Sequence, residues 1–585
     1  MLSWAIALCA AVSLVPVCVA WGKDTVKVEL RGLEGKAKEN AEAVLSLPPG
    51  LVRDGKVDRY WLNRLVDQAP DKVREALEPF GYYDAAAAVR IEAPEEGTYR
   101  IVVTVDPGEP VRVTSVDVRL TGAGADETAL RRLADDFPLK KGDALRQDVY
   151  EQMKGALQSR AQDLGYLDAD FAVHTIRLNR AARSAAIDLE LATGPEYLFD
   201  GVTLEGASEY PDHFLRRYLA FKAGEPFSYA KLGQTQLNFG NSDRFEEVII
   251  TPRKEAAKDR NIPVDIRLTP SAPKRLRPGV GYGTDTGPRI SLKYQDVNFL
   301  HKGHELQGEF YLSQRSQAAA GKYILPDRST ASRYTSLELG LMRENVDTYL
   351  TRSVFAELDR VRDFGGGRKG SLYLRLLYER YAVGSEDSTS FVVLPGVRYS
   401  QRHFIGSELR PVQGYRFALE ARGTTRALGS DTGFGQLLAS GNLLASLPFR
   451  LSLLSRIDVG YTDESGPWEK IPASLRFFAG GDHSVRGYAY QSLGPKDNTG
   501  MVVGGRHRLV GSVEVERALR ENWGVAAFFD AGNAFDSYSH LQLYKGAGIG
   551  VRYYTLIGPI RVDLARQLRV EDPAYRVHLS VGLAF

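Results

Sequence analysis

The chain has 585 residues, with 75 Lys and Arg against 73 Asp and Glu and a formal net charge of +2. This balance argues against nucleic acid as the main partner, because nucleic-acid-binding proteins concentrate positive charge. The length exceeds one ordinary domain and predicts several units.

The first 20 residues are predicted to be a signal peptide. They carry no charge, are mostly apolar and end in Cys18-Val19-Ala20, which suits signal peptidase. An uncleaved anchor is the alternative. The only two cysteines, Cys9 and Cys18, lie here, so the mature chain forms no disulfide and depends on burial and backbone pairing. No other run of 18 apolar residues occurs, which excludes a helical membrane protein and leaves a β-barrel open.

From Asp24 to Ala272, helical and strand patterns alternate in three units of about 80 residues. Similar segments mark the units: FGYYDAAAAVRI from Phe80, LGYLDADFAVHTI from Leu164 and SDRFEEVIITP from Ser242. Each unit reads strand, helix, helix, strand, strand, which predicts an α+β module with two helices on one face of a sheet. The predicted modules are 24–108, 109–195 and 196–272. In the second, an apolar stripe at helical spacing consists of Val149, Met153, Leu157 and Ala161.

After Arg277 a two-residue alternation continues to the end of the chain. Val513 and Val515 alternate with Ser512, Glu514 and Glu516, and Ile560, Val562 and Leu564 alternate with Arg561 and Asp563. One face suits lipid and the other carries charge. About sixteen such segments, which in lipid must leave no unpaired edge, predict a 16-stranded antiparallel transmembrane β-barrel over 275–585. A double sandwich is the alternative, but its turns recur every 8 to 12 residues or so.

The two ends of the predicted barrel differ in character. The first strand contains Gly279 and Gly281, and strand glycine weakens packing and pairing. The last segment, Tyr575 to Phe585, places Leu583 and Phe585 on one apolar face and ends on an aromatic residue. We expect a weak seam between these strands. Cysteines at Val280 and Leu579 are expected to lock it.

Motifs for catalysis are weak. Asp-Thr-Gly triplets begin at Asp285 and Asp431, but polar residues precede both, and these are ordinary turn residues. His301 and His304 lie at a hairpin, where a spacing of three guarantees no common face. No nucleophile elbow, H-E-x-x-H or Walker sequence is present. We expect no enzyme activity, no cofactor and no metal.

The segment GGDHSVRGY, Gly480 to Tyr488, lies in a long loop between two strand patterns. An arginine folded back into the barrel is costly to desolvate unless a carboxylate pairs with it. Phe528, Asp530 and Gly532 share one face of a later strand, and Asp530 is a candidate partner for Arg486. The alternative is an extracellular loop with a solvated Arg486.

These motifs resemble those of a known family. Gly480, Gly481, Val485, Arg486, Gly487 and Tyr488 resemble the loop-six motif of the BamA/TamA POTRA-barrel superfamily. Phe528-x-Asp530-x-Gly532 resembles its companion motif on the thirteenth strand, and the segment ending in Leu583 and Phe585 resembles its terminal sorting strand. The three modules resemble POTRA modules, and their number is that of the TamA branch. The third unit departs, with SDRF where the others have GY.

The resemblance implies a Gram-negative outer-membrane protein with its POTRA modules in the periplasm. It implies an insertase subunit that assists assembly of autotransporters and other outer-membrane proteins. The implied partners are a long TamB-like, inner-membrane-anchored periplasmic protein, unfolded outer-membrane clients and outer-membrane lipids, with a further role in moving phospholipid. The alternatives are a two-partner-secretion transporter and a passive porin or receptor.

Overall fold

A computed structural model describes residues 24–53, 55–95, 97–407, 410–555 and 558–581. The predicted signal peptide lies outside these residues. The chain forms two compact units. The first comprises the described residues up to Gly201 with Phe221–Leu232 and Pro252–Val264, and the second comprises Val202–Ala220, Gly233–Thr251 and the described residues from Asp265.

The first module is a three-stranded sheet packed against two helices. Its elements are β1 (Thr25–Arg31), α1 (Gly35–Val44), β2 (Val52–Arg53), β3 (Lys56–Val57), α2 (Arg59–Leu77), η1 (Glu78–Phe80), β4 (Ala86–Glu95) and β5 (Thr98–Asp106). The strand order is β1-β5-β4, with β1 parallel to β5. Asp58 caps α2 by accepting hydrogen bonds from the backbone N–H groups of Tyr60 and Trp61. The core joins Leu65 and Val73 of α2 to Val103 of β5.

The second module repeats this order. Its elements are β6 (Arg112–Thr121), α3 (Thr128–Asp135), α4 (Gln147–Asp163), β7 (Asp170–Asn179) and β8 (Ser184–Ala192), with strand order β6-β8-β7. Leu157 and Ala161 of the predicted apolar stripe are fully buried. Val149 and Met153 are partly buried against a neighbouring apolar cluster that includes Tyr150 and Leu189.

The third module contains β9 (Leu198–Glu205), α5 (Asp212–Arg216), α6 (Tyr229–Gly240), β10 (Phe245–Pro252), η2 (Lys254–Ala256) and β11 (Asn261–Pro270), with strand order β10-β11-β9. All three modules therefore have the predicted order of strand, two helices and two strands. The short β2–β3 hairpin in the first module was not predicted. Among the described residues, no helix has both the length and the apolar character needed to cross a membrane.

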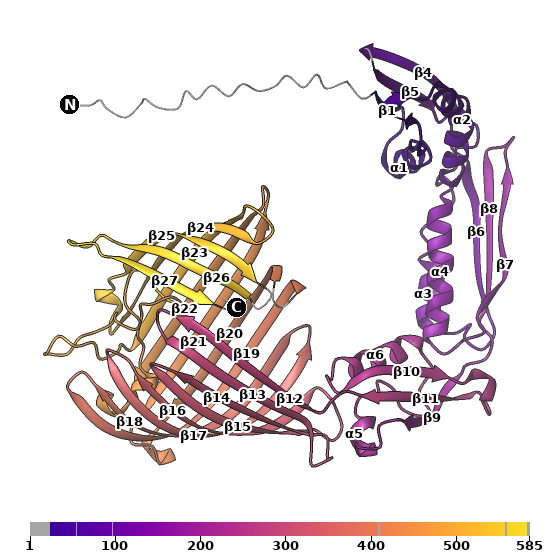
Figure 1. Cartoon of the computed structure of the whole chain (residues 1–585). Helices are drawn as coiled ribbons and strands as arrows, with labels where there is room; N and C mark the ends of the chain where they lie inside the picture. Colours follow the sequence, from indigo (N-terminus) through magenta and orange to yellow (C-terminus); the bar gives the residue numbers. More distant parts are fainter. Residues whose placement is uncertain (1–23, 54, 96, 408–409, 556–557, 582–585) are drawn as a thin grey trace, which may run out of the picture. The chain divides into compact units, whose positions relative to one another are not determined.

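The predicted closed sixteen-stranded barrel is confirmed (Figure 1). Its strands are β12 (Lys274–Gly283), β13 (Gly287–Phe299), β14 (His304–Ser313), β15 (Ser316–Pro326), β16 (Arg333–Asn345), β17 (Tyr349–Gly365), β18 (Arg368–Val383), β19 (Glu386–Ser407), β20 (Arg410–Thr424), β21 (Phe434–Leu447), β22 (Leu451–Glu464), β23 (His507–Ala518), β24 (Trp523–Phe535), β25 (Tyr544–Thr555), β26 (Gly558–Leu568) and β27 (Tyr575–Val581). Short 3-10 turns lie in the connections: η3 (Arg426–Leu428), η4 (Trp468–Lys470), η5 (Ala473–Leu475) and η6 (Tyr538–His540).

The two faces of the barrel wall follow the alternation. Large apolar side chains such as Val280, Leu372 and Ile549 are exposed on the outer face, whereas Asp530 and Arg552 are fully buried inside. A membrane-spanning barrel needs this separation, because its outer face contacts hydrocarbon.

The barrel closes between β12 and β27. Among the described residues, the register of this seam contains one pair, Gly283 with Ser580, whereas β12 pairs with β13 along its whole length. The same register does not set Val280 opposite Leu579, so the cysteine pair expected from sequence is wrong in position. Leu583 and Phe585 lie outside the described residues.

Candidate functional site

The loop that joins β22 to β23 packs inside the barrel, and its glycines make this possible. Gly480, Gly481 and Gly487 have positive φ angles of 102°, 104° and 97°, which L side chains rarely adopt. A Cβ at Gly480 would lie 2.4 Å from the carbonyl oxygen of Ala489, and one at Gly481 would lie 2.5 Å from an Asp285 carboxylate oxygen. Without side chains at these positions, the loop can pack against its own backbone at Gly480 and against the turn between β12 and β13 at Gly481.

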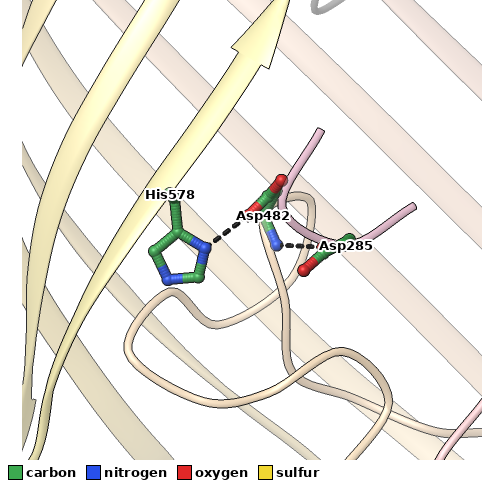
Figure 2. Close-up of side chains that lie close together, drawn as sticks. All are labelled: Asp285, Asp482 and His578. Carbon is green, nitrogen blue, oxygen red and sulfur yellow. Dashed lines mark hydrogen bonds and ion pairs between the residues drawn. The ribbon is translucent and has the colours of Figure 1, made fainter. Parts of the chain in front are cut away.

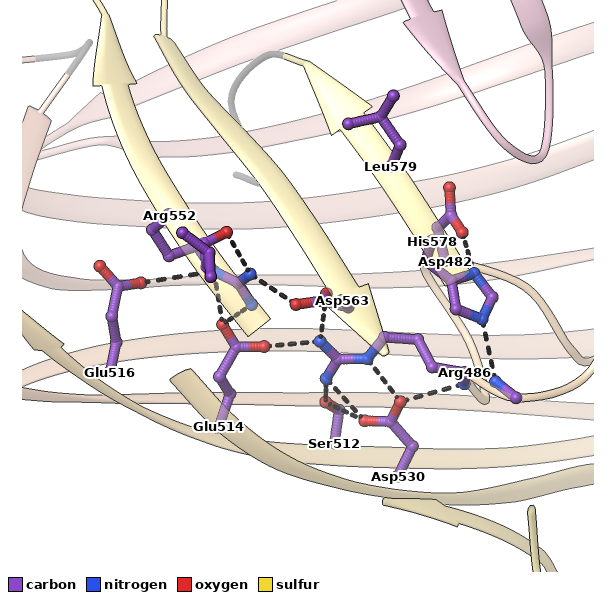
Figure 3. Close-up of polar contacts among 12 residues, drawn as sticks. Asp482, Arg486, Ser512, Glu514, Glu516, Asp530, Arg552, Asp563, His578 and Leu579 are labelled. Atoms are coloured by element: carbon purple, nitrogen blue, oxygen red, sulfur yellow. Dashed lines mark hydrogen bonds and ion pairs between the residues drawn. The ribbon is translucent and has the colours of Figure 1, made fainter. Parts of the chain in front are cut away.

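Arg486 is buried against the barrel wall and forms a two-pronged pair with Asp530 (Figure 3). Its Nε donates to Asp530 Oδ2 at 2.7 Å and its Nη2 donates to Oδ1 at 3.0 Å. The Arg486 backbone N–H donates to the same carboxylate at 3.0 Å. The guanidinium carbon lies 3.4 Å from the centre of the Phe528 ring, a cation–π contact. The structure thus brings Arg486, Phe528 and Asp530 together.

Two further carboxylates contact the same guanidinium. Nη1 of Arg486 donates to Glu514 at 2.7 Å and to Asp563 at 3.0 Å. Arg552, which is fully buried, also pairs with both carboxylates. Arg486 of the loop, Arg552 of β25 and three carboxylates from β23, β24 and β26 therefore form one network of buried ion pairs inside the lumen. Because a buried charge is costly without partners, the loss of one member leaves others uncompensated.

The other motif residues have packing roles. Val485 and Tyr488 join a buried apolar cluster with Ala479, Leu493 and Val510. A Cβ at Gly532 would lie 2.8 Å from the Leu509 carbonyl oxygen and from Val510, so a side chain there is excluded. Gly279 and Gly281 likewise lie under the side chains of Ser291 and Arg289, on the neighbouring strand.

The loop also contacts both strands of the seam (Figure 2). The Thr284 hydroxyl donates to the Asp482 carboxylate at 3.0 Å, and the Asp482 backbone N–H donates to Asp285 at 2.6 Å. On the other side, His578 of β27 pairs with Asp482 through Nδ1. The Thr284 backbone N–H donates directly to the Leu579 carbonyl at 3.0 Å. We name Thr284, Asp285, Asp482 and His578 the seam clasp.

The seam clasp fits a hydrogen-bond relay better than a metal site. Ligand atoms of Asp285, Asp482 and His578 lie within 4.8 Å of one another. However, Nε2 of His578 accepts a hydrogen bond of 2.9 Å from the Gly487 backbone N–H. The proton of the neutral ring must then sit on Nδ1, which donates to Asp482. A metal ion would require the Nδ1 lone pair that this proton occupies.

Sequence reasoning missed several of these residues. The alternation predicted that Ser512, Glu514 and Asp563 lie on the charged face. It did not predict their positions along the barrel axis, so it could not show that they lie beside Arg486. No sequence pattern indicated that Thr284, Asp482 and His578 contact one another. Of the two Asp-Thr-Gly triplets, Asp285 contacts Asp482, whereas Asp431 accepts a hydrogen bond from the Phe391 backbone N–H at 2.7 Å.

Comparison with known protein families decides the family. The model of the Omp85 superfamily domain matches residues 273–585, which is more than half of the chain. The chain belongs to the Omp85 superfamily. The model of "POTRA domain TamA domain 1" matches residues 27–107, and a POTRA model described as "Surface antigen variable number repeat" matches 197–271. The Omp85 protein is therefore an outer-membrane β-barrel with periplasmic POTRA modules.

Named relatives agree with this assignment. The chain is 22% identical over 560 residues to outer membrane protein assembly factor BamA of Nitratidesulfovibrio vulgaris, covering 92% of this chain and 69% of that protein. It is 20% identical over 600 residues to BamA of Neisseria meningitidis, covering 88% and 72%. The solved structure of Haemophilus ducreyi BamA lacking POTRA domains 1–3 shares the fold, with a TM-score of 0.63, 16% identity and coverage of 80% of this chain and 99% of that one.

We predict that Arg486→Ala destabilises the barrel more than Asp530→Asn does. The first change leaves three buried carboxylates without Arg486, whereas the second leaves Arg486 with Glu514 and Asp563. Breaking a buried pair costs about 3–5 kcal/mol. The measurement is the temperature at which the folded band disappears in heat-dependent gel migration. Arg426→Ala, at an exposed arginine, is the control, and equal midpoints for all variants would contradict the prediction.

We also predict that the seam clasp becomes more stable in mild acid. Asp285 lies in the turn outside β12 and β13, where burial and then the nearby Asp482 carboxylate raise its pKa to about 6. Because the folded pKa exceeds the unfolded one, stability rises as pH falls through 6 toward about 4. Between pH 7 and pH 5 the gain is about 1 kcal/mol. Asp285→Asn should abolish this dependence in unfolding measurements, and an unchanged pH profile in that variant would refute the assignment.

Proposed function

We propose that this Omp85 protein is an insertase subunit of the TamA type, which assists assembly of autotransporters and other outer-membrane proteins. The observation that carries the proposal is the match of the TamA-type POTRA model to residues 27–107, in a chain with three modules before one barrel. The names of the relatives, outer-membrane protein assembly factors, support the general activity. We propose the modules at 24–108, 109–195 and 196–272, the barrel at 275–585 and a cleaved signal peptide at 1–20.

The proposed path for a client strand is the seam between β12 and β27. Every other pair of neighbouring barrel strands has an extended ladder of backbone pairs, whereas this seam has one pair among the described residues. Backbone pairing is the main force that closes a barrel in lipid, where no water can replace a lost hydrogen bond. We propose that the wall opens at this seam when a client strand enters.

The proposed partner is a long TamB-like periplasmic protein bound by the POTRA modules. Among the described residues, β4 in the first module and β7 in the second lie at the edge of their sheets. An extended segment can add to such an edge by backbone hydrogen bonds. The same route suits an unfolded client. We further propose that the chain and this partner move phospholipid to the outer membrane.

Reconstitution tests the activity. The purified full chain in liposomes is expected to speed insertion of an unfolded autotransporter barrel at least several-fold over empty liposomes. A matched liposome sample with a porin of similar size controls for non-specific defects. Insertion no faster than with the porin would reject the insertase function and favour a passive porin or receptor.

A disulfide across the seam tests the path. Cysteines at Gly283 and Ser580, which are directly paired, should form a disulfide when oxidised and reduce client insertion at least tenfold, with recovery on reduction. The chain is suited to this test because its only other cysteines lie at positions 9 and 18. Ala439→Cys with Val459→Cys, a pair within the extended β21–β22 ladder, is the control. Insertion by the locked seam at the unlocked rate would reject lateral opening.

Recovery of the partner separates the TamA-type role from two-partner secretion. We expect the full chain, isolated from its native membrane after crosslinking, to bring down one very long periplasmic protein. A two-partner-secretion transporter would instead bring down one secreted client, and that result would replace the proposal.

A further inference from the structure

A basic cavity lies on the lumenal wall formed by the first five barrel strands. Its volume is about 430 Å3, and its charged lining residues are Arg275, Arg277, Lys293, Glu309, Lys322 and Glu338. They come from β12, β13, β14, β15 and β16. None belongs to the cluster around Arg486 or to the seam clasp.

Successive residues of a strand point to opposite faces of the sheet. The exposed apolar residues of β12 mark its outer face, so the residues between them point into the lumen. On β12, Leu276, Val280 and Tyr282 are exposed on the outer face, with Leu276 at 62% and Val280 at 82% exposure. Arg275 and Arg277 have the opposite parity. Arg277 pairs in register with Lys293, and Lys293 pairs with Glu309, so the three side chains share the lumenal face.

The cavity has an excess of positive charge. Lys293 forms an ion pair with Glu309 at 3.0 Å, and Lys322 forms one with Glu338 at 3.2 Å. These pairs account for both carboxylates in the lining. Arg275 donates to the Asp243 backbone carbonyl at 2.6 Å, which leaves its charge uncompensated. Within the described part of the chain, the guanidinium of Arg277 has no hydrogen-bond or ion-pair partner.

Arg277 and Lys293 also face each other as like charges on neighbouring strands. Like charges directly opposite in a sheet are destabilising. A bound anion between them would turn this repulsion into two attractions. Phosphate suits the position, because arginine presents a planar fork of donors that matches phosphate oxygens and lysine adds a compact positive charge.

We propose that this cavity binds the phosphate group of a phospholipid headgroup. The two faces of β12 fit an amphipathic ligand: acyl chains can lie against Leu276, Val280 and Tyr282 outside, and the headgroup can reach Arg275 and Arg277 inside. The path between the faces runs over the edge of β12, which has one register pair with β27 among the described residues. The inference rests on the proposed function in one respect, since the seam must open for the headgroup to enter.

The test measures lipid binding to the purified full chain by native mass spectrometry from detergent micelles. Dihexanoylphosphatidylglycerol is the lipid probe, inorganic phosphate tests a free anion, and dihexanoylglycerol tests the acyl chains alone. Arg277→Gln combined with Lys293→Gln should weaken binding of the phospholipid at least tenfold, because charged hydrogen bonds are lost. Glu309→Gln, which releases Lys293 from its ion pair, should strengthen it.

Arg426→Gln, which removes one positive charge elsewhere, is the control. Arg426 is an exposed arginine in η3, outside the barrel strands, and its loss should leave binding unchanged. Heat-dependent gel migration verifies that every variant remains folded. If the double variant binds the phospholipid as tightly as the unmodified chain, the site is wrong. Inorganic phosphate that competes as strongly as the phospholipid would overturn the headgroup assignment in favour of a free anion, and equal binding of dihexanoylglycerol would overturn it in favour of the acyl chains alone.

Client insertion by the same variants separates this inference from the proposed function. Loss of phospholipid binding with normal client insertion would support the cavity and leave the insertase function intact. Phospholipid binding that depends on Arg277, in a protein that inserts no client, would refute the insertase function alone.

Discussion

The buried guanidinium of Arg486 is the interaction on which the interior of the barrel depends. It joins the inward-folded loop to Glu514 on β23, Asp530 on β24 and Asp563 on β26. Each of these charges is costly to remove from water alone, and their ion pairs with Arg486 and Arg552 offset part of this cost. The loop can therefore reach this position stably only when those three strands stand in register. Loop docking and completion of the wall near its last strand are thus coupled through one side chain.

The same loop supports the wall at the seam between β12 and β27, which has one register pair among the described residues. Asp482 lies four residues before Arg486 and contacts Thr284 on one side of the seam and His578 on the other. At this point side-chain hydrogen bonds, each worth about 1 kcal/mol, join the two sides of the seam in addition to the backbone bond from Thr284 to Leu579. Such contacts break one by one, whereas an extended ladder resists opening along its length. The loop therefore anchors firmly through Arg486 and holds the seam through weaker, separable bonds.

The alternation of apolar and polar residues and the glycines of the loop could be predicted from sequence. The residue-by-residue pairing between barrel strands could not. Alternation identified the lumenal face of β23 and β26, and parity alone selected Asp530 for Arg486. It could not select Glu514 and Asp563 as well, because their heights depend on strand stagger. Asp482 and His578 are 96 residues apart, and neither lies in a pattern that marks the other. The seam shows the same limit: alternation cannot distinguish Val280 with Leu579 from the observed pair, Gly283 with Ser580.

The charges of the lumen divide into two kinds. Around β23 to β26, buried arginines and carboxylates form ion pairs with one another. These charges hold the loop and are not available to a ligand. Along β12 to β16, Arg277 is exposed to the lumen and lies opposite another cation, Lys293. Lys293 is ion-paired with Glu309, whereas among the described residues the guanidinium of Arg277 has no such partner. Its charge is therefore available to a ligand in the lumen, and the strand that carries it is also the strand beside the seam.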